Sequence, residues 1–253
     1  MITFPDDVKA AYSRSKNIIR KTPLDHSPAL SNIIDGDVYL KLDNIQKTGS
    51  FKFRGAISKM TSLNEKQRKR GVVTASTGNH GAAVSLGMKI LGINGSIIVP
   101  ENIAPNKVEN IQNLGGTVEY YGNDCLEAEQ RAQEISSGTG ATYISPYNDP
   151  VIVAGQGTMG VELDEDLKNI DAVIVAVGGG GLISGIGGYL KTVQPNVEMI
   201  GCSPKNSCVM YESLQAGRIL DLPSKPTLSD GTAGGVEENS ITFEICKKII
   251  SDF

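Results

Sequence analysis

The 253-residue chain has no tryptophan, five phenylalanines and a net charge of −4. So few aromatic rings leave little surface on which nucleic-acid bases could stack, and an acidic chain gains no attraction to phosphate backbones. Its densest basic stretch, residues 66–70, lies in a polar segment and is typical of a solvated helix end. We therefore expect no nucleic-acid partner.

Cysteine and histidine are also too sparse for a zinc site. The four cysteines form no Cys-x-x-Cys pair, and only His26 and His80 could join them. This composition predicts reduced thiols, no metal and a cytoplasmic protein. The polar, acidic residues 1–7 do not resemble a signal peptide.

Long apolar segments are missing as well. The longest uncharged run, residues 172–190, contains seven glycines. It is better explained by a buried strand, a glycine loop and a helix start than by a membrane span. No membrane partner is expected.

From residue 71 onward, β-branched runs alternate with helical stretches. This alternation predicts βαβ units and a parallel sheet. The expected strands are residues 72–75, 96–99, 117–121, 142–144, 172–177 and 198–203. The expected helices are residues 82–91, 105–114, 126–136, 161–168, 182–192, 208–216 and 241–250. Residues 223–235 are expected to form a long loop.

Residues 47–56 read KTGSFKFRGA and place Lys52 at the start of a helix, among small and aromatic neighbours. A helix N-terminus favours anions, so the dipole does not explain a lysine at this position. Taken alone, Lys52 is most simply a surface lysine.

Residues 177–182 read VGGGGL, between an expected strand and an expected helix. Consecutive glycines permit positive φ and let several backbone N–H groups converge on one anion, to which the helix N-terminus adds its dipole. This pattern indicates a phosphate cradle. It contains no G-x-G-x-x-G dinucleotide fingerprint, and the chain has no G-K-[ST] P-loop. The alternative is a tight turn without a ligand.

Residues 76–81 read STGNHG, in a second turn between strand and helix. Two hydroxyls, an amide and free N–H groups could hold a carboxylate. The competing interpretation is that Ser76 or Thr77 caps the following helix. We expect His80 to be structural rather than catalytic. A lysine, a phosphate cradle and a carboxylate clamp on one parallel sheet are the parts that an enzyme using pyridoxal phosphate needs.

The three segments together resemble the signatures of the fold type II pyridoxal phosphate enzymes, and within them the branch of threonine/serine dehydratases and serine racemases. Residues 154–158 (AGQGT) and 228–231 (LSDG) also match that branch, and the resemblance runs in order along nearly the whole chain. It implies a two-lobed α/β fold like that of the tryptophan synthase β-subunit, with parallel or mostly parallel sheets flanked by helices. Residues 1–45 plus 150–253 would form a large cofactor-binding lobe and residues 46–149 a small substrate-clamping lobe, with the cofactor in the cleft between them.

The resemblance also implies roles for individual residues. Lys52 would carry the Schiff base to pyridoxal phosphate and, once free, remove the Cα proton. Phe51 would lie near the cofactor ring, Asn79 would bind its phenolic oxygen, and the backbone of Gly231 would face the ring from the other side. The phosphate would be held by Gly178, Gly179, Gly180, Gly181 and Leu182. The substrate carboxylate would be bound by Ser76, Thr77 and Gly78.

The implied reaction is the β-elimination of a small β-hydroxy amino acid, L-threonine or L-serine, to a 2-oxo acid and ammonia. The alternatives are a serine or aspartate-type racemase, a 3-hydroxyaspartate-type dehydratase, and an inactive module that only binds pyridoxal phosphate or an amino acid. Elimination is favoured because Thr77 stands where the racemases have a serine, and because residues 201–209 lack the acid of their divalent-metal site. A homo-oligomer, a dimer or tetramer, is expected.

The family places a serine or cysteine of a late turn at the pyridine nitrogen. No comparable turn follows Gly231, and Ser240 is better explained as a helix N-cap. We therefore expect this partner beyond residue 253, in a C-terminally truncated chain of low stability and weak or absent activity. The alternative is a natural short form that leaves the nitrogen to solvent or to Cys246.

Overall fold

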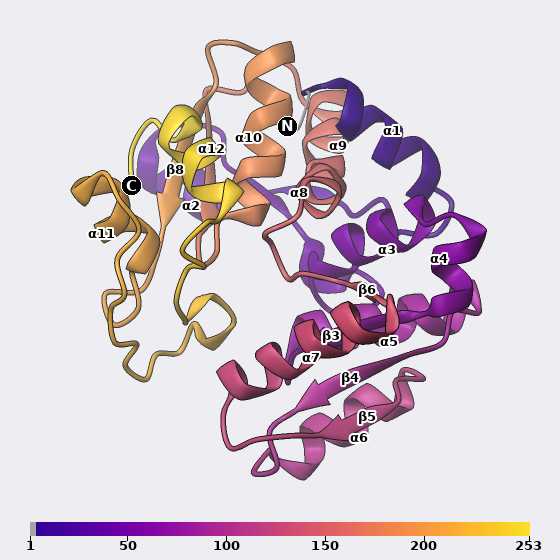
Figure 1. Cartoon of the computed structure of the whole chain (residues 1–253). Helices are drawn as coiled ribbons and strands as arrows, with labels where there is room; N and C mark the ends of the chain where they lie inside the picture. Colours follow the sequence, from indigo (N-terminus) through magenta and orange to yellow (C-terminus); the bar gives the residue numbers. More distant parts are fainter. Residues whose placement is uncertain (1–3) are drawn as a thin grey trace.

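The computed structural model describes residues 4–253 (Figure 1). Residues 1–3, with which the larger expected lobe begins, lie outside the described part. Two parallel sheets and a small antiparallel one are flanked by helices. The α/β fold with parallel sheets predicted from the sequence is therefore confirmed.

The larger sheet has the strand order β5-β4-β3-β6, with every pair parallel. Its strands are β3 (Val72–Ala75), β4 (Gly95–Val99), β5 (Val118–Tyr120) and β6 (Thr142–Tyr143). The helices that connect them are α5 (Asn79–Leu91), α6 (Pro105–Asn113) and α7 (Cys125–Thr139). Buried side chains of α5 and α6 join those on one face of the sheet, and α7 packs on the other through Ala128 and Ala132.

The second parallel sheet pairs β7 (Ala172–Ala176) with β8 (Glu198–Cys202), and α10 (Gly181–Val193) connects them. The antiparallel pair is β1 (Leu24–His26) with β2 (Tyr39–Lys41). The remaining helices are α1 (Asp6–Ser15), α2 (Pro28–Ile34), α3 (Lys52–Ser62), α4 (Glu65–Arg70), α8 (Pro150–Gln156), α9 (Thr158–Asp166), α11 (Val209–Ala216) and α12 (Ile241–Ile249), with short 3-10 turns at η1 (Asp43–Ile45) and η2 (Asp230–Thr232).

Two main apolar cores hold these elements. One gathers side chains of α1, α9, α10, β7, β8 and α12, and the other those of α3, α5, β3 and β4. Helix α3 packs on both α5 and α8. It meets α8 at two glycines, since a Cβ on Gly155 would lie 2.8 Å from the Cα of Gly55. Helix α3 therefore contacts one helix of the expected small lobe, α5, and one of the expected large lobe, α8. These contacts do not fix the boundaries between the lobes, which stay a prediction.

Between residues 4 and 253, no helix is both long enough and apolar enough to cross a membrane.

Candidate active site

Lys52 is the first residue of α3, as the sequence predicted. Its Nζ donates a 2.8 Å hydrogen bond to the carbonyl oxygen of Pro146 and lies 5.4 Å from the centre of the Phe51 ring. The surrounding protein removes water from the ammonium and lowers the pKa of Lys52 to about 8. A substantial fraction of the amine is therefore neutral near physiological pH.

The glycine loop, residues 178–181, connects β7 to α10. Gly180 has a φ of 79°, which favours glycine. A Cβ on Gly179 would lie 2.6 Å from the Tyr147 ring, and one on Gly178 would lie 2.6 Å from the carbonyl oxygen of Thr232. Side chains do not fit here, and the loop leads into a helix N-terminus whose first N–H groups have no partner within the helix. These are the features of an anion cradle.

Helix α12 supports the same loop. The Thr242 hydroxyl donates a 2.6 Å hydrogen bond to the carbonyl oxygen of Gly179. Cys246 is fully buried, with its Sγ 3.5 Å from the Ser184 hydroxyl and 3.9 Å from the carbonyl oxygen of Gly180. Burial raises the pKa of its thiol to about 11. Cys246 thus packs against the loop as a neutral thiol.

The turn at residues 76–79 differs from one expectation. Helix α5 begins at Asn79 instead of residue 82, and its N-cap is Gly78, which makes no side-chain capping bond. The Ser76 hydroxyl instead accepts a 3.2 Å hydrogen bond from the N–H of Gly78 within the turn. The proposed capping by Ser76 or Thr77 is therefore wrong. Gly78 and Asn79 are exposed, which leaves this helix N-terminus open to a ligand.

Three segments far apart in the sequence meet near this turn. A Cβ on Gly231 would lie 3.7 Å from the Nδ2 of Asn79, and Thr232, in the same 3-10 turn, contacts Gly178. The turn belongs to the long segment before α12, drawn in yellow in Figure 1. The structure thus brings together three of the predicted site residues, Asn79, Gly178 and Gly231.

His80 is buried, with 4% of its surface exposed. Its Nε2 lies 2.9 Å from the carbonyl oxygen of Ile144, so that nitrogen carries the proton and donates it. Burial, followed by the nearby charge of Lys52, lowers the pKa of His80 to about 3. The ring is neutral and serves as a structural donor.

Sequence reasoning missed the segment from Pro146 to Asn148. Pro146 accepts the bond from Lys52, and Tyr147 packs against Gly179 and Gly181. This segment follows the carboxyl end of β6, the edge of a parallel sheet where ligands bind, and that position was the one available signal.

The donor set suits pyridoxal phosphate. It offers a partly neutral amine, a glycine loop without room for side chains, and an exposed amide at Asn79. In the described residues, no three His, Cys, Asp or Glu side chains lie close enough to bind a metal ion.

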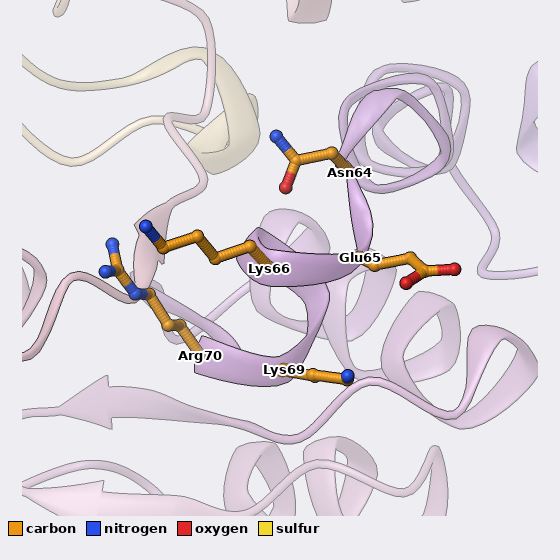
Figure 2. Close-up of a pocket in the computed structure, with 5 residues that line it drawn as sticks. All are labelled: Asn64, Glu65, Lys66, Lys69 and Arg70. Carbon is orange, nitrogen blue, oxygen red and sulfur yellow. The ribbon is translucent and has the colours of Figure 1, made fainter.

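A hollow of about 710 Å³ lies elsewhere, around α4. Figure 2 shows Lys66 and Arg70 extending to one side of this helix and Glu65 to the other. It is lined by Asn64, Glu65, Lys66, Lys69 and Arg70, which are exposed. None of these is a predicted site residue. The hollow lies at the basic helix end, residues 66–70, that the sequence predicted to be solvated.

The family model described as "Pyridoxal-phosphate dependent enzyme" matches residues 16–253. This chain belongs to that family. L-threonine ammonia-lyase of Thermotoga maritima is 44% identical over 252 residues, which make up 100% of this chain and 62% of that protein. The catabolic L-threonine dehydratase of Escherichia coli is 37% identical over 98% of this chain and 75% of its own length.

Among solved structures, maize serine racemase is similar with a TM-score of 0.93 and 33% identity, covering 98% of this chain and 74% of that one. The resemblance to fold type II pyridoxal phosphate enzymes is thereby confirmed, and the cofactor of the family is pyridoxal phosphate. The Thermotoga enzyme is substantially longer than this chain, which spans under two thirds of its length.

Proposed function

We propose that this protein is a lyase that removes water and ammonia from L-threonine or L-serine and releases a 2-oxo acid. Relatives named threonine ammonia-lyase and threonine dehydratase support this assignment. The observation that carries it is the position of Lys52, whose amine has a lowered pKa and binds Pro146, next to the residue that packs on the glycine loop.

In this proposal Lys52 holds the cofactor and then acts as general base. A base must be unprotonated, and a pKa near 8 leaves a useful neutral fraction of the amine at neutral pH. The bond to Pro146 restricts where that amine can reach. When bound, pyridoxal phosphate supplies an aldehyde for the substrate amine and an electron sink for the electrons left at Cα.

The other predicted residues bind and orient. Gly178, Gly179, Gly180, Gly181 and Leu182 would hold the phosphate at the start of α10. Ser76, Thr77 and Gly78 would hold the substrate carboxylate at the start of α5, with Asn79 binding the ring oxygen, Phe51 beside the ring and Gly231 facing it. Closure of a small lobe, residues 46–149, onto a large one, residues 1–45 plus 150–253, would exclude water from the substrate.

A serine racemase is the second candidate, because a racemase is among the similar structures. Racemisation needs an acid–base group on the face opposite lysine, and Thr77 carries a methyl group there that stiffens χ1. Elimination should therefore dominate. We also propose a cytoplasmic homo-oligomer, a dimer or tetramer. Exposed apolar side chains support association, with Ile33 77% and Ile174 72% exposed.

The test is a set of assays on the purified chain with added pyridoxal phosphate. L-threonine, L-serine, 3-hydroxyaspartate and D-serine are each assayed for 2-oxo acid release and for inversion at Cα. The proposal expects 2-oxo acid from L-threonine or L-serine. Faster inversion than elimination favours the racemase, and turnover of 3-hydroxyaspartate alone favours that dehydratase. Cofactor binding without turnover leaves only a binding module.

A further inference from the structure

The glycine loop is held between two segments that lie far apart in the sequence, residues 146–148 and helix α12. On one side the Tyr147 ring packs against Gly179. On the other, Thr242 at the start of α12 donates to the carbonyl oxygen of Gly179. Asn148 connects the two segments, because its Oδ1 accepts a 2.9 Å hydrogen bond from the N–H of Ile241. One amide side chain therefore links the two segments that hold the loop.

The other end of the same amide is also bound. The Nδ2 of Asn148 donates to Oε2 of Glu237, and the N–H of Glu237 donates a 2.9 Å hydrogen bond to the Tyr147 hydroxyl. The side chain of Asn148 thus accepts at one atom and donates at the other. A carboxylate of the same shape could accept but could not donate.

The segment that carries Asn148 also contacts the lysine. Pro146, two residues earlier, accepts the hydrogen bond from Lys52, and the Ser145 hydroxyl accepts a 2.9 Å bond from the N–H of Asn148. The position of Lys52 and the position of the glycine loop are thus both set by one short turn.

We propose that Asn148 is a positioning residue that fixes the glycine loop relative to Lys52. The loop can then bind the phosphate while Lys52 binds the aldehyde of the same cofactor molecule. The inference rests on the proposed function, in which the loop holds the phosphate and Lys52 holds the aldehyde. It does not place Asn148 in contact with cofactor or substrate.

The surroundings of Glu237 make this contact sensitive to charge. Burial raises the pKa of the Glu237 carboxyl, and Oε1 is buried without a hydrogen-bond partner within the described residues. Oε2 depends on the amide of Asn148. A second carboxylate at position 148 would repel Glu237 and break the contacts that connect Tyr147 to α12.

The test uses Asn148→Asp, Glu237→Gln and the double variant. Asn148→Asp keeps the acceptor for Ile241 but opposes Glu237, and we expect its dissociation constant for pyridoxal phosphate to rise at least about tenfold. Glu237→Gln can still accept from Asn148 and should stay within about threefold of the parent. In the double variant the new amide donates to the new carboxylate, which should restore affinity to within about threefold. Asn239→Asp adds the same charge at an exposed position of the neighbouring loop and should change nothing.

Hydrogen exchange of the cofactor-free chain provides the second readout. The amides of residues 178–182 should exchange faster in Asn148→Asp and return to the parent rate in the double variant. Parent-like affinity and exchange in Asn148→Asp, or a double variant as impaired as the single one, would overturn the inference. If the parent forms no bond between Lys52 and pyridoxal phosphate, the proposed function fails, and the exchange rates still decide the role of Asn148 in holding the loop.

Discussion

The ε-amine of Lys52 lies 2.8 Å from the carbonyl oxygen of Pro146. Among residues 4–253, no carboxylate is bonded to it, so the removal of water is not offset by an opposite charge, and the pKa of Lys52 falls to about 8. A lysine intended for stability would be exposed or paired with an acid. A lowered pKa at a buried lysine costs stability and is what the role proposed for Lys52 requires.

This expense can be measured with Lys52→Met in the cofactor-free chain. The pKa of Lys52 is about 8 in the folded chain and near 10.5 in the unfolded one. Between these pH values the unfolded chain binds more protons, so the stability of the parent rises with pH. At pH 7 Lys52→Met should be more stable by roughly 1–3 kcal/mol, and the difference should vanish toward pH 10.5. Urea unfolding checks this, with the exposed Lys47→Met as control. A loss of stability in Lys52→Met at pH 7 contradicts the account.

The glycine loop gives a steric prediction. In Gly179→Ala the new methyl would overlap the Tyr147 ring, 2.6 Å away, and should displace the loop. We expect pyridoxal phosphate to bind at least about tenfold more weakly, by titration of the visible absorbance. Gly138→Ala is the matched control, because a Cβ at that position meets nothing within 4 Å. Equal affinity for pyridoxal phosphate in the two variants would contradict the proposal that the loop is part of the cofactor site.

The helix that carries Lys52 is anchored by a buried ion network. Arg54 is fully buried, and its guanidinium bonds both oxygens of Asp43 and both oxygens of Glu162. Arg54→Met would leave the buried carboxylate of Asp43 without a cation and Glu162 with Lys41 alone, and should lower the free energy of unfolding by about 3–5 kcal/mol. Arg131→Met, on the surface, should cost less than about 1 kcal/mol. Denaturant titration of both variants provides the comparison, and similar small losses would contradict the role of Arg54.

Regular local patterns explain what could be predicted from the sequence. Residues 72–74 are β-branched, follow a glycine and, with Ala75, form β3 as expected. Helix α8 was missed because its residues, PVIVAGQ, include a β-branched run typical of a strand. Asp149 decides otherwise, since its side chain caps the N–H groups of Val151 and Ile152, and proline at the first turn favours a helix start.

The site shows the same division. Lys52, the glycine loop and the turn at residues 76–79 are continuous motifs that a sequence displays directly. Pro146, Tyr147 and Asn148 are not, because their contacts are with residues 52, 179 and 237–242, and long-range pairing leaves no local pattern. Ser240 is the N-cap residue of α12, as predicted, but its hydroxyl bonds that of Thr242 instead of a backbone N–H.

The most direct test of the central claim is to find the lysine that binds the cofactor. The chain is incubated with pyridoxal phosphate, reduced with borohydride, digested and analysed by mass spectrometry, alongside Lys52→Ala. The account predicts one modified peptide, containing Lys52, and loss of both this adduct and 2-oxo acid release from L-threonine in the variant. A specific adduct on another lysine, or a Lys52→Ala variant that still releases the 2-oxo acid at the parent rate, would contradict it.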